Sequence, residues 1–349
     1  MTAPPPTILQ TTIHPLAPQL TQNVHAYLES NWSFSSKKYE TAFFAMDFPR
    51  LLALICPEGD IERLESAAVF VCLTGLLDDT FSTLPLAESQ KIANRLWTIL
   101  EEGPTGKATG TGTGTGTDTK EESIPASAPE KVLLKLLSDM KSHDEGLAKE
   151  VMRGAIQLLE AQTSEERLEM KDLDLDQYFA FRFRDVGGEF FTALLRYTSN
   201  IPLPRSLREE FFHLVNAVIR HVILTNDIIS WDKEAKEARE GEGESESESG
   251  RGGDKEGSAI CSVVPILARN LGISVEGAKR VLWGAVRELE REIRLEGENM
   301  MKELANLNHG EEKWTAQERE AGERYIRALG FLASGNEEWS KTTSRYKVN

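Results

Sequence analysis

The chain has 349 residues, of which 40% are hydrophobic, so it can bury one large core or two modest ones. Its formal net charge of −16 at pH 7 argues against a nucleic-acid-binding surface, because such a surface needs a basic face. Only three cysteines occur, without a CxxC pair, which predicts neither a disulfide framework nor a structural zinc site. The chain has no uncharged apolar run of about 18 residues and no secretory signal at its start, so we expect no membrane span and a cytoplasmic location.

The first third of the chain predicts two helices between polar segments. Residues 1–20, which open with Met-Thr-Ala-Pro-Pro-Pro, are expected to be disordered. Apolar residues recur at three- and four-residue spacing over 60–79 and 89–100, which indicates amphipathic helices. Residues 103–128 contain a Gly-Thr repeat that cannot bury enough apolar surface to offset the entropy of ordering, so we expect a low-complexity loop there.

The remaining two thirds predict further helices in the same way. The same apolar spacing recurs over 131–140, 146–162, 207–235, 274–307 and 316–331. Residues 236–257 alternate Glu with Ser and Gly, which predicts a second low-complexity loop. Alternating strand patterns bounded by turn residues are missing. We therefore predict one all-α domain over residues 21–349, a helical bundle with two disordered insertions.

The helix predicted over 207–235 changes character along one face. Its inward stripe is apolar as far as Val222, and continuing by fours from there leads to Asn226, Ser230 and Glu234. Buried polar groups are costly unless they bind something. An amide oxygen, a hydroxyl and a carboxylate on successive turns can converge on one Mg²⁺, which takes oxygen ligands at about 2.1 Å. The alternative is a helix end that emerges into solvent.

A second acidic feature ends the apolar helix predicted over 60–79. Asp78 and Asp79 stand at its C-terminal end, where acidic side chains oppose the helix macrodipole. A bound cation would offset that cost, whereas the alternative is a solvated cap ahead of Pro85. Two acid-bearing helix ends in one acidic helical protein favour the metal interpretation.

These two features resemble the metal motifs of the class I terpene synthase family. The stretch Asn-Asp-Ile-Ile-Ser-Trp-Asp-Lys-Glu from Asn226 to Glu234 is similar to the family's second metal motif, and Asp78-Asp79 resembles its aspartate-rich first motif. The resemblance extends from about residue 24 to the C-terminus and points to the fungal sesquiterpene cyclase-like branch.

Further positions match the same family in order and spacing. Arg182 resembles its diphosphate-sensing arginine, Asp185 the acidic linker that follows, and Arg345-Tyr346 the Arg-Tyr ending of fungal members. Arg184 is an alternative sensor, but its spacing to the second metal motif fits less well. Two positions depart from the family pattern: Ser82 stands where a third acid is usual, and Gly75 stands where several relatives carry an aromatic residue, a change that would enlarge the pocket. Glu88 is a candidate to replace the missing acid.

The resemblance implies a set of ligands for a substrate diphosphate and three Mg²⁺ ions. Asp78 and Asp79 would bind metal in the first motif, and Asn226, Ser230 and Glu234 would bind metal in the second. The side chains that would hydrogen-bond the diphosphate are Arg182, Lys233, Arg345 and Tyr346.

A carbocation formed by loss of diphosphate needs an apolar pocket lined by aromatic faces. The resemblance makes Trp339 the best candidate for such a face. Phe48, Phe190 and Phe191 are weaker candidates, each better explained singly as core packing. Gly187-Gly188 is expected to break a helix at this site.

We therefore interpret the chain as a Mg²⁺-dependent cyclase of a linear isoprenoid diphosphate, most simply the fifteen-carbon farnesyl diphosphate, acting as a monomer or homodimer. Three alternatives stay open at this point: a diterpene cyclase acting on geranylgeranyl diphosphate, a chain-elongating prenyl diphosphate synthase on the same fold, and a non-catalytic helical binding protein.

Overall fold

The computed structural model describes residues 5–102, 127–169, 174–245, 261–305 and 313–347. Regular secondary structure in these ranges is helical throughout, which confirms the predicted all-α fold. None of the helices in the described ranges is both long and apolar enough to cross a membrane.

Seven helices lie in the described part of the chain before residue 163. They are α1 (Ala17–Asn31), α2 (Lys37–Ala45), α3 (Phe48–Ile55), α4 (Ile61–Phe81), α5 (Leu86–Glu102), α6 (Ala128–His143) and α7 (Glu145–Gln162). Those in the rest of the described chain are α8 (Glu166–Glu169), α9 (Leu175–Asp185), α10 (Gly188–Thr198), α11 (Arg205–Glu210), α12 (Phe212–Ser245), α13 (Val263–Leu271), α14 (Val275–Ala305) and α15 (Ala316–Thr342).

Local capping explains where several of these helices begin. The Asp60 carboxylate accepts hydrogen bonds from the backbone N–H groups of Glu62 and Arg63, and so starts α4. At the start of α15, Thr315 and Glu318 form a reciprocal capping box.

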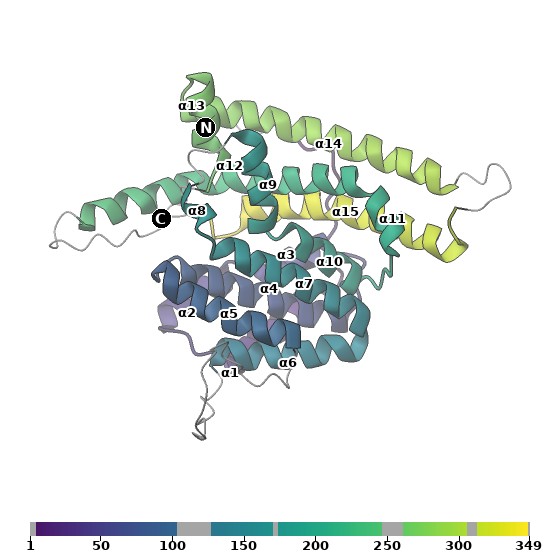
Figure 1. Cartoon of the computed structure of the whole chain (residues 1–349), viewed down its shortest axis with the longest axis horizontal. Helices are drawn as coiled ribbons and strands as arrows, with labels where there is room; N and C mark the ends of the chain where they lie inside the picture. The colour runs from purple at the N-terminus through teal and green to yellow at the C-terminus, as the bar shows by residue number, and fades with distance from the viewer. Residues whose placement is uncertain (1–4, 103–126, 170–173, 246–260, 306–312, 348–349) are drawn as a thin grey trace, which may run out of the picture.

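The long helices α12, α14 and α15 run lengthwise across the upper part of the molecule, and α1, α2, α5 and α6 form the lower part (Figure 1). Between them lies α3, which packs against α1, α4 and α15. Seven of the eight α3 residues are buried, so this short helix lies in the centre of the hydrophobic core. It approaches α15 closely at Gly335, where an added Cβ would lie 2.7 Å from the backbone carbonyl of Leu54.

The predicted helix over 207–235 is in fact two helices. Phe211 separates α11 from α12 with φ −80° and ψ 1°, and its ring is fully buried, so packing of this residue ends the first helix. The other end also differs, because α12 continues to Ser245 and the loop predicted from residue 236 begins too early. Residues 246–257 of that loop lie outside the described residues, as do residues 103–126 of the first predicted loop, whose last residue already belongs to α6.

The predicted helix over 316–331 was also too short. The helix continues for eleven further residues to Thr342. Its last three turns bury polar side chains, among them Ser334, Asn336 and Glu337, so the apolar periodicity stops while the helix does not.

The prediction that residues 1–20 are disordered is wrong for residues 5–20. The backbone N–H of the buried His14 donates to the carbonyl of Ala53 at 2.8 Å, and α1 begins at Ala17. Further upstream, the Thr7 hydroxyl and the Ile8 N–H both donate to the Glu290 carboxylate on α14, at 2.6 and 3.0 Å. A short segment without apolar periodicity is thus ordered by hydrogen bonds to distant helices.

Glu290 belongs to a buried ionic cluster that joins α12, α14 and α15. Arg287 pairs with Glu290 and Glu337, and Lys341 also pairs with Glu337. His221 lies 3.6 Å from Glu290 and 3.3 Å from Glu337 and is fully buried. Burial lowers the pKa of His221, but the two carboxylates outweigh that effect, and the pKa is raised above its usual value.

Replacing Gly335 with Ala is expected to lower the free energy of unfolding by about 3 kcal/mol, the upper end of the cost of overpacking, because the clash is with backbone that cannot rotate away. Gly330→Ala is the matched control on the same helix, since an added Cβ there meets nothing within 4 Å. It should raise stability by about 0.5–1 kcal/mol through helix propensity. Urea unfolding followed by circular dichroism measures both, and equal effects would contradict the close α3–α15 contact.

The raised pKa of His221 predicts a pH-dependent stability. A histidine whose folded-state pKa exceeds its unfolded value stabilises the fold fully below about pH 6.5, and this contribution is lost as pH rises through the folded pKa. We expect the melting temperature to fall more between pH 6.5 and 9 in the unmodified protein than in His221→Gln. The exposed His213 on the same helix is the control, and His213→Gln should leave the pH dependence unchanged. Parallel curves for all three proteins would show that His221 stays neutral.

Candidate active site

The aspartate pair lies in the last turn of α4 and is paired rather than freely solvated. Arg345 donates to Asp78 at 2.8 Å and to Asp79 at 3.3 Å. The Tyr39 hydroxyl donates to the other oxygen of Asp79 at 2.9 Å. Ser82, which replaces the usual third acid, is the C-cap of α4, and its hydroxyl donates to the carbonyl of Asp79.

On α12, the polar stripe predicted from Asn226 onward faces the region of the aspartate pair. The Asn226 amide donates to the Tyr346 hydroxyl at 2.7 Å, and its oxygen accepts from Arg182 at 2.9 Å. The Ser230 hydroxyl is buried and makes no hydrogen bond of good geometry, although it lies near enough to Glu234 to lower the pKa of that carboxyl. Burial is the larger effect and raises the pKa of Glu234 to about 7. An unpartnered buried hydroxyl beside a desolvated carboxyl fits a hard cation with oxygen ligands.

The C-terminal segment brings the two motifs together. After α15 ends, the Thr343 hydroxyl donates to the carbonyl of Met46 at 2.7 Å, which anchors the segment to the α2–α3 turn. Two residues further on, Arg345 bonds to α4, and Tyr346 after it bonds to α12. Burial raises the pKa of the Tyr346 hydroxyl, and the charges of Glu234 on α12 and Asp78 on α4 both add to this effect, so the two motifs lie near the same side chain.

Behind Asn226 lies a buried network around Arg182. Arg182 pairs with Asp185 within its own helix and with Asp227 at 3.1 Å. Asp227 is completely buried and also accepts from the Tyr178 hydroxyl and from the Val263 N–H. Burial raises the pKa of Asp227, whereas two arginines keep the pKa of Asp185 below its usual value despite burial. The network holds the Arg182 guanidinium beside Asn226.

Asp227 is a residue that the sequence analysis did not single out. The signal was present, because Asp227 follows the buried Ile223 by four residues on a second inward stripe of α12. Asp227 does not lie on the stripe through Val222, from which the candidate ligands were predicted. By contrast, Arg184 points elsewhere and pairs with Glu166 at 2.8 Å, so the structure places Arg182 rather than Arg184 at the site.

Lys233 is the predicted site residue that the structure directs elsewhere. Its amine lies 3.5 Å from Glu237, one turn further along α12, and its side chain is 30% exposed. Glu88, the candidate for the missing third acid, is exposed in the first turn of α5.

The predicted helix break at Gly187-Gly188 is confirmed. Gly187 has φ +76°, the left-handed region that favours glycine, and it separates α9 from α10. The break orients α9, with Arg182 and Asp185, differently from α10. Phe190 on α10 is fully buried and packs edge-on against Phe70, as expected for core packing, while Phe191 is partly buried.

Trp339 lies against the C-terminal segment with its orientation fixed. Its indole N–H donates to the carbonyls of Met46 and Asp47, both at 3.0 Å. Its ring stacks on Phe48 with centroids 5.5 Å apart and meets Tyr346 edge-on. Phe48 also fills the space beside Gly75, where an added Cβ would lie 2.8 Å from the Phe48 ring. Gly75 therefore accommodates Phe48, and the enlarged pocket expected at this position is not present.

A second group of possible metal ligands is His221, Glu290 and Glu337, whose ligand atoms lie within 4.8 Å of one another. Arg287 and Lys341 already neutralise both carboxylates, so a divalent cation here would add uncompensated buried charge. We assign this cluster a structural role.

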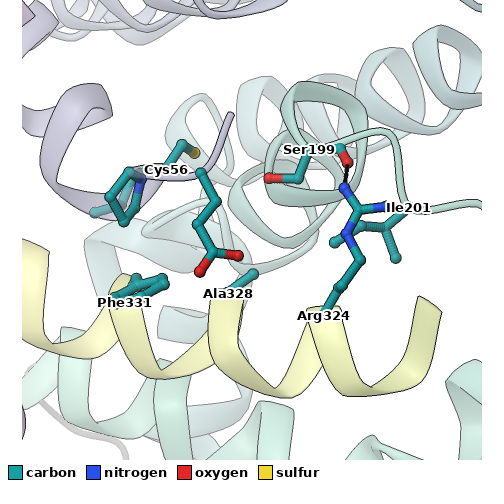
Figure 2. Close-up of a pocket in the computed structure, with 9 residues that line it drawn as sticks. Cys56, Ser199, Ile201, Arg324, Ala328 and Phe331 are labelled. Carbon is teal, nitrogen blue, oxygen red and sulfur yellow. Dashed lines mark hydrogen bonds between the residues drawn. The ribbon is translucent and has the colours of Figure 1, made fainter. Parts of the chain in front are cut away.

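The cavity in Figure 2 also lies apart from the candidate site. It encloses about 10 Å³ between the end of α3 and α15, close to the room that one water molecule needs. Arg324 closes one side of it by donating to the carbonyl of Ser199 (Figure 2). None of the predicted site residues lines this cavity.

Comparison with known proteins identifies the family of this chain. The model of terpene synthase family 2, C-terminal metal binding, matches residues 70–292. Aristolochene synthase of Penicillium roqueforti is 29% identical over 343 residues, which cover 98% of this chain and 88% of that protein. Aristolochene synthase of Aspergillus terreus is 27% identical over 345 residues, covering 99% and 94%.

Solved structures show the same fold. The crystal structure of aristolochene synthase from Penicillium roqueforti matches with a TM-score of 0.72 at 25% identity, covering 98% of this chain and all of that one. Germacradien-4-ol synthase from Streptomyces citricolor matches with a TM-score of 0.75 at 15% identity, which speaks for the fold alone.

The helical fold and the two facing oxygen-rich motifs define a class I terpene synthase, a lyase that uses divalent metal, and the predicted class is thereby confirmed. The family model covers more than half of the residues, so the chain belongs to terpene synthase family 2.

Removing the Tyr346 hydroxyl tests its bond to Asn226. Tyr346→Phe keeps the ring against Trp339 but frees the Asn226 amide, so we expect turnover to fall about five- to tenfold with an unchanged melting temperature. The buried Tyr27 hydroxyl on α1 has no hydrogen-bond partner, so Tyr27→Phe should keep turnover within twofold. Steady-state release of diphosphate measures both. Equal rates in the two variants would mean that the Tyr346 contact has no catalytic consequence.

Proposed function

We propose that this terpene synthase converts farnesyl diphosphate to a cyclic sesquiterpene and inorganic diphosphate with Mg²⁺ as its metal. The near-full-length likeness to aristolochene synthases of two fungi supports this choice of reaction. The observation that carries the proposal is the pair of contacts from adjacent residues: Arg345 to Asp78 and Tyr346 to Asn226.

Asp78 and Asp79 on α4 and Asn226, Ser230 and Glu234 on α12 would together hold three Mg²⁺ ions. The donors are all oxygens, which suits this hard cation, and the Ser230 hydroxyl has no competing hydrogen bond. Bound Mg²⁺ would supply Lewis-acid stabilisation of the charge that develops on the leaving diphosphate.

The cationic side chains would bind the diphosphate itself. Arg182 is held beside Asn226 by Asp185 and Asp227, so its guanidinium is already oriented. Arg345 would exchange the Asp78 carboxylate for diphosphate oxygens, a change between two anions that match its geometry. Two side chains complete this set of donors: Tyr346, through its hydroxyl, and Lys233, which would have to leave Glu237.

The carbocation would face the ring of Trp339. Hydrogen bonds to two backbone carbonyls fix this indole, and Phe48 stacks on its ring. An aromatic face attracts a cation by about 0.5–2 kcal/mol, and more when the site is dry. Because Phe48 fills the space beside Gly75, the fifteen-carbon substrate is favoured over the twenty-carbon one.

Incubation of the purified protein with farnesyl or geranylgeranyl diphosphate and Mg²⁺, followed by gas chromatography and mass spectrometry of the extract, tests the proposal. We expect cyclic fifteen-carbon products without any isopentenyl diphosphate co-substrate. We expect turnover to fall by about 100-fold or more in each of Asp78→Asn, Asn226→Ala and Glu234→Ala, because each variant loses a metal ligand. A 100-fold loss corresponds to an activation barrier raised by about 2.7 kcal/mol.

Glu88→Gln is the control for these variants, because Glu88 is an exposed acid close to the first motif in sequence. It should keep the unmodified rate. Inactivity of the unmodified protein on both substrates would overturn the cyclase proposal, and normal rates in the three metal-motif variants would overturn the ligand assignment.

A further inference from the structure

Arg167 is a cationic residue at the candidate site that neither the motifs nor the family resemblance singled out. It belongs to the short helix α8, and its side chain is only 17% exposed. Its guanidinium donates to the carbonyl of Gln162 at 3.3 Å and to the sulfur of Cys261 at 3.4 Å. These contacts place the side chain between the end of α7 and the residues that precede α13.

The same guanidinium lies between two carboxylates of the site. Its Nη2 is 3.9 Å from Asp78 in the first metal motif, and its Nε is 3.7 Å from Asp185 beside Arg182. Both distances exceed those of hydrogen bonds, and both carboxylates have shorter contacts with other arginines: Asp78 with Arg345, and Asp185 with Arg182. Arg167 therefore lies within ion-pair distance of both acids but makes no hydrogen bond to either.

Arg167 and Arg345 both lie at Asp78, and Arg182 shares Asp185 with Arg167, so three guanidiniums from separate segments border this part of the site. Arg167 comes from α8, Arg182 from α9, and Arg345 from the C-terminal segment. If Asp78 binds a divalent cation, Arg167 and Arg345 both lose a counterion. A polyanion at the same place would neutralise the two arginines again. Planar guanidiniums form well-matched hydrogen bonds with phosphate oxygens.

We propose that Arg167 is a further diphosphate-binding residue, which donates from Nη2 to the substrate diphosphate when Asp78 binds metal. This inference rests on the proposed function of the site. It predicts that Arg167 contributes to affinity for the diphosphate group itself, independently of the hydrocarbon chain. A bracing role alone, through Gln162 and Cys261, would affect stability instead.

The experiment is titration calorimetry of inorganic diphosphate into the full chain with Mg²⁺ present, together with melting temperatures without ligand. Arg167→Gln should weaken diphosphate binding about tenfold or more. Arg167→Met keeps the buried aliphatic stem and should do the same, so the test survives if one of the variants fails to fold. Arg184→Gln is the matched control, because Arg184 is exposed and pairs with Glu166, the neighbour of Arg167. It should stay within twofold of the unmodified protein.

Diphosphate affinity within twofold of the unmodified protein in either folded Arg167 variant would overturn the inference. A melting temperature lowered without a change in affinity would do the same, since it identifies a brace. Failure of the proposed function has a different signature: the unmodified protein itself would then show no Mg²⁺-dependent diphosphate binding.

Discussion

The candidate site depends on the contacts that two adjacent residues make with two different helices. Arg345 bonds to the acids at the end of α4, and Tyr346 bonds to Asn226 on α12. Burial raises the pKa of the Tyr346 hydroxyl, and the charges of Glu234 and Asp78 both contribute in the same direction, so the two motifs border one space. The segment that carries both residues is itself held by Thr343 and Met46. The proposed metal-ligand residues are therefore arranged around a side-chain clamp that a diphosphate and its metals would replace.

The charges behind this clamp are buried in pairs. Asp227 is completely inaccessible, yet Arg182, Tyr178 and the Val263 N–H all bond to it. Removing one partner of such a network leaves an uncompensated buried charge and costs far more than a surface pair is worth. This is why the Arg182 guanidinium can be oriented before any substrate arrives. The cluster of His221 with Glu290 and Glu337 also buries its charges in pairs. Its role is structural, since Glu290 anchors the N-terminal segment.

Packing between α3, α4 and α15 in the core positions the side chains next to the candidate site. Gly335 lets α15 approach α3 closely, and α3 begins with Phe48. Phe48 occupies the room beside Gly75 and stacks on Trp339, so a glycine that departs from the family pattern is compensated by a ring from another helix. The packing of Phe48 against Gly75 and Trp339 consequently joins three segments that are distant in sequence.

The sequence by itself determined the helical class, the acids at the end of α4, the polar stripe from Asn226 to Glu234 and the break at Gly187, because each follows from local periodicity or from backbone preference at one residue. The tertiary structure alone decided which charges meet. Arg167 has no local signature, and the partners of Asp227 and Lys233 cannot be read from their spacing along α12. The order of residues 5–20 and the full length of α15 were likewise hidden, since hydrogen bonds and buried polar groups replace apolar periodicity there. Ion pairs and hydrogen bonds between distant segments depend on how the helices pack in three dimensions. The spacing of residues along one helix does not predict them.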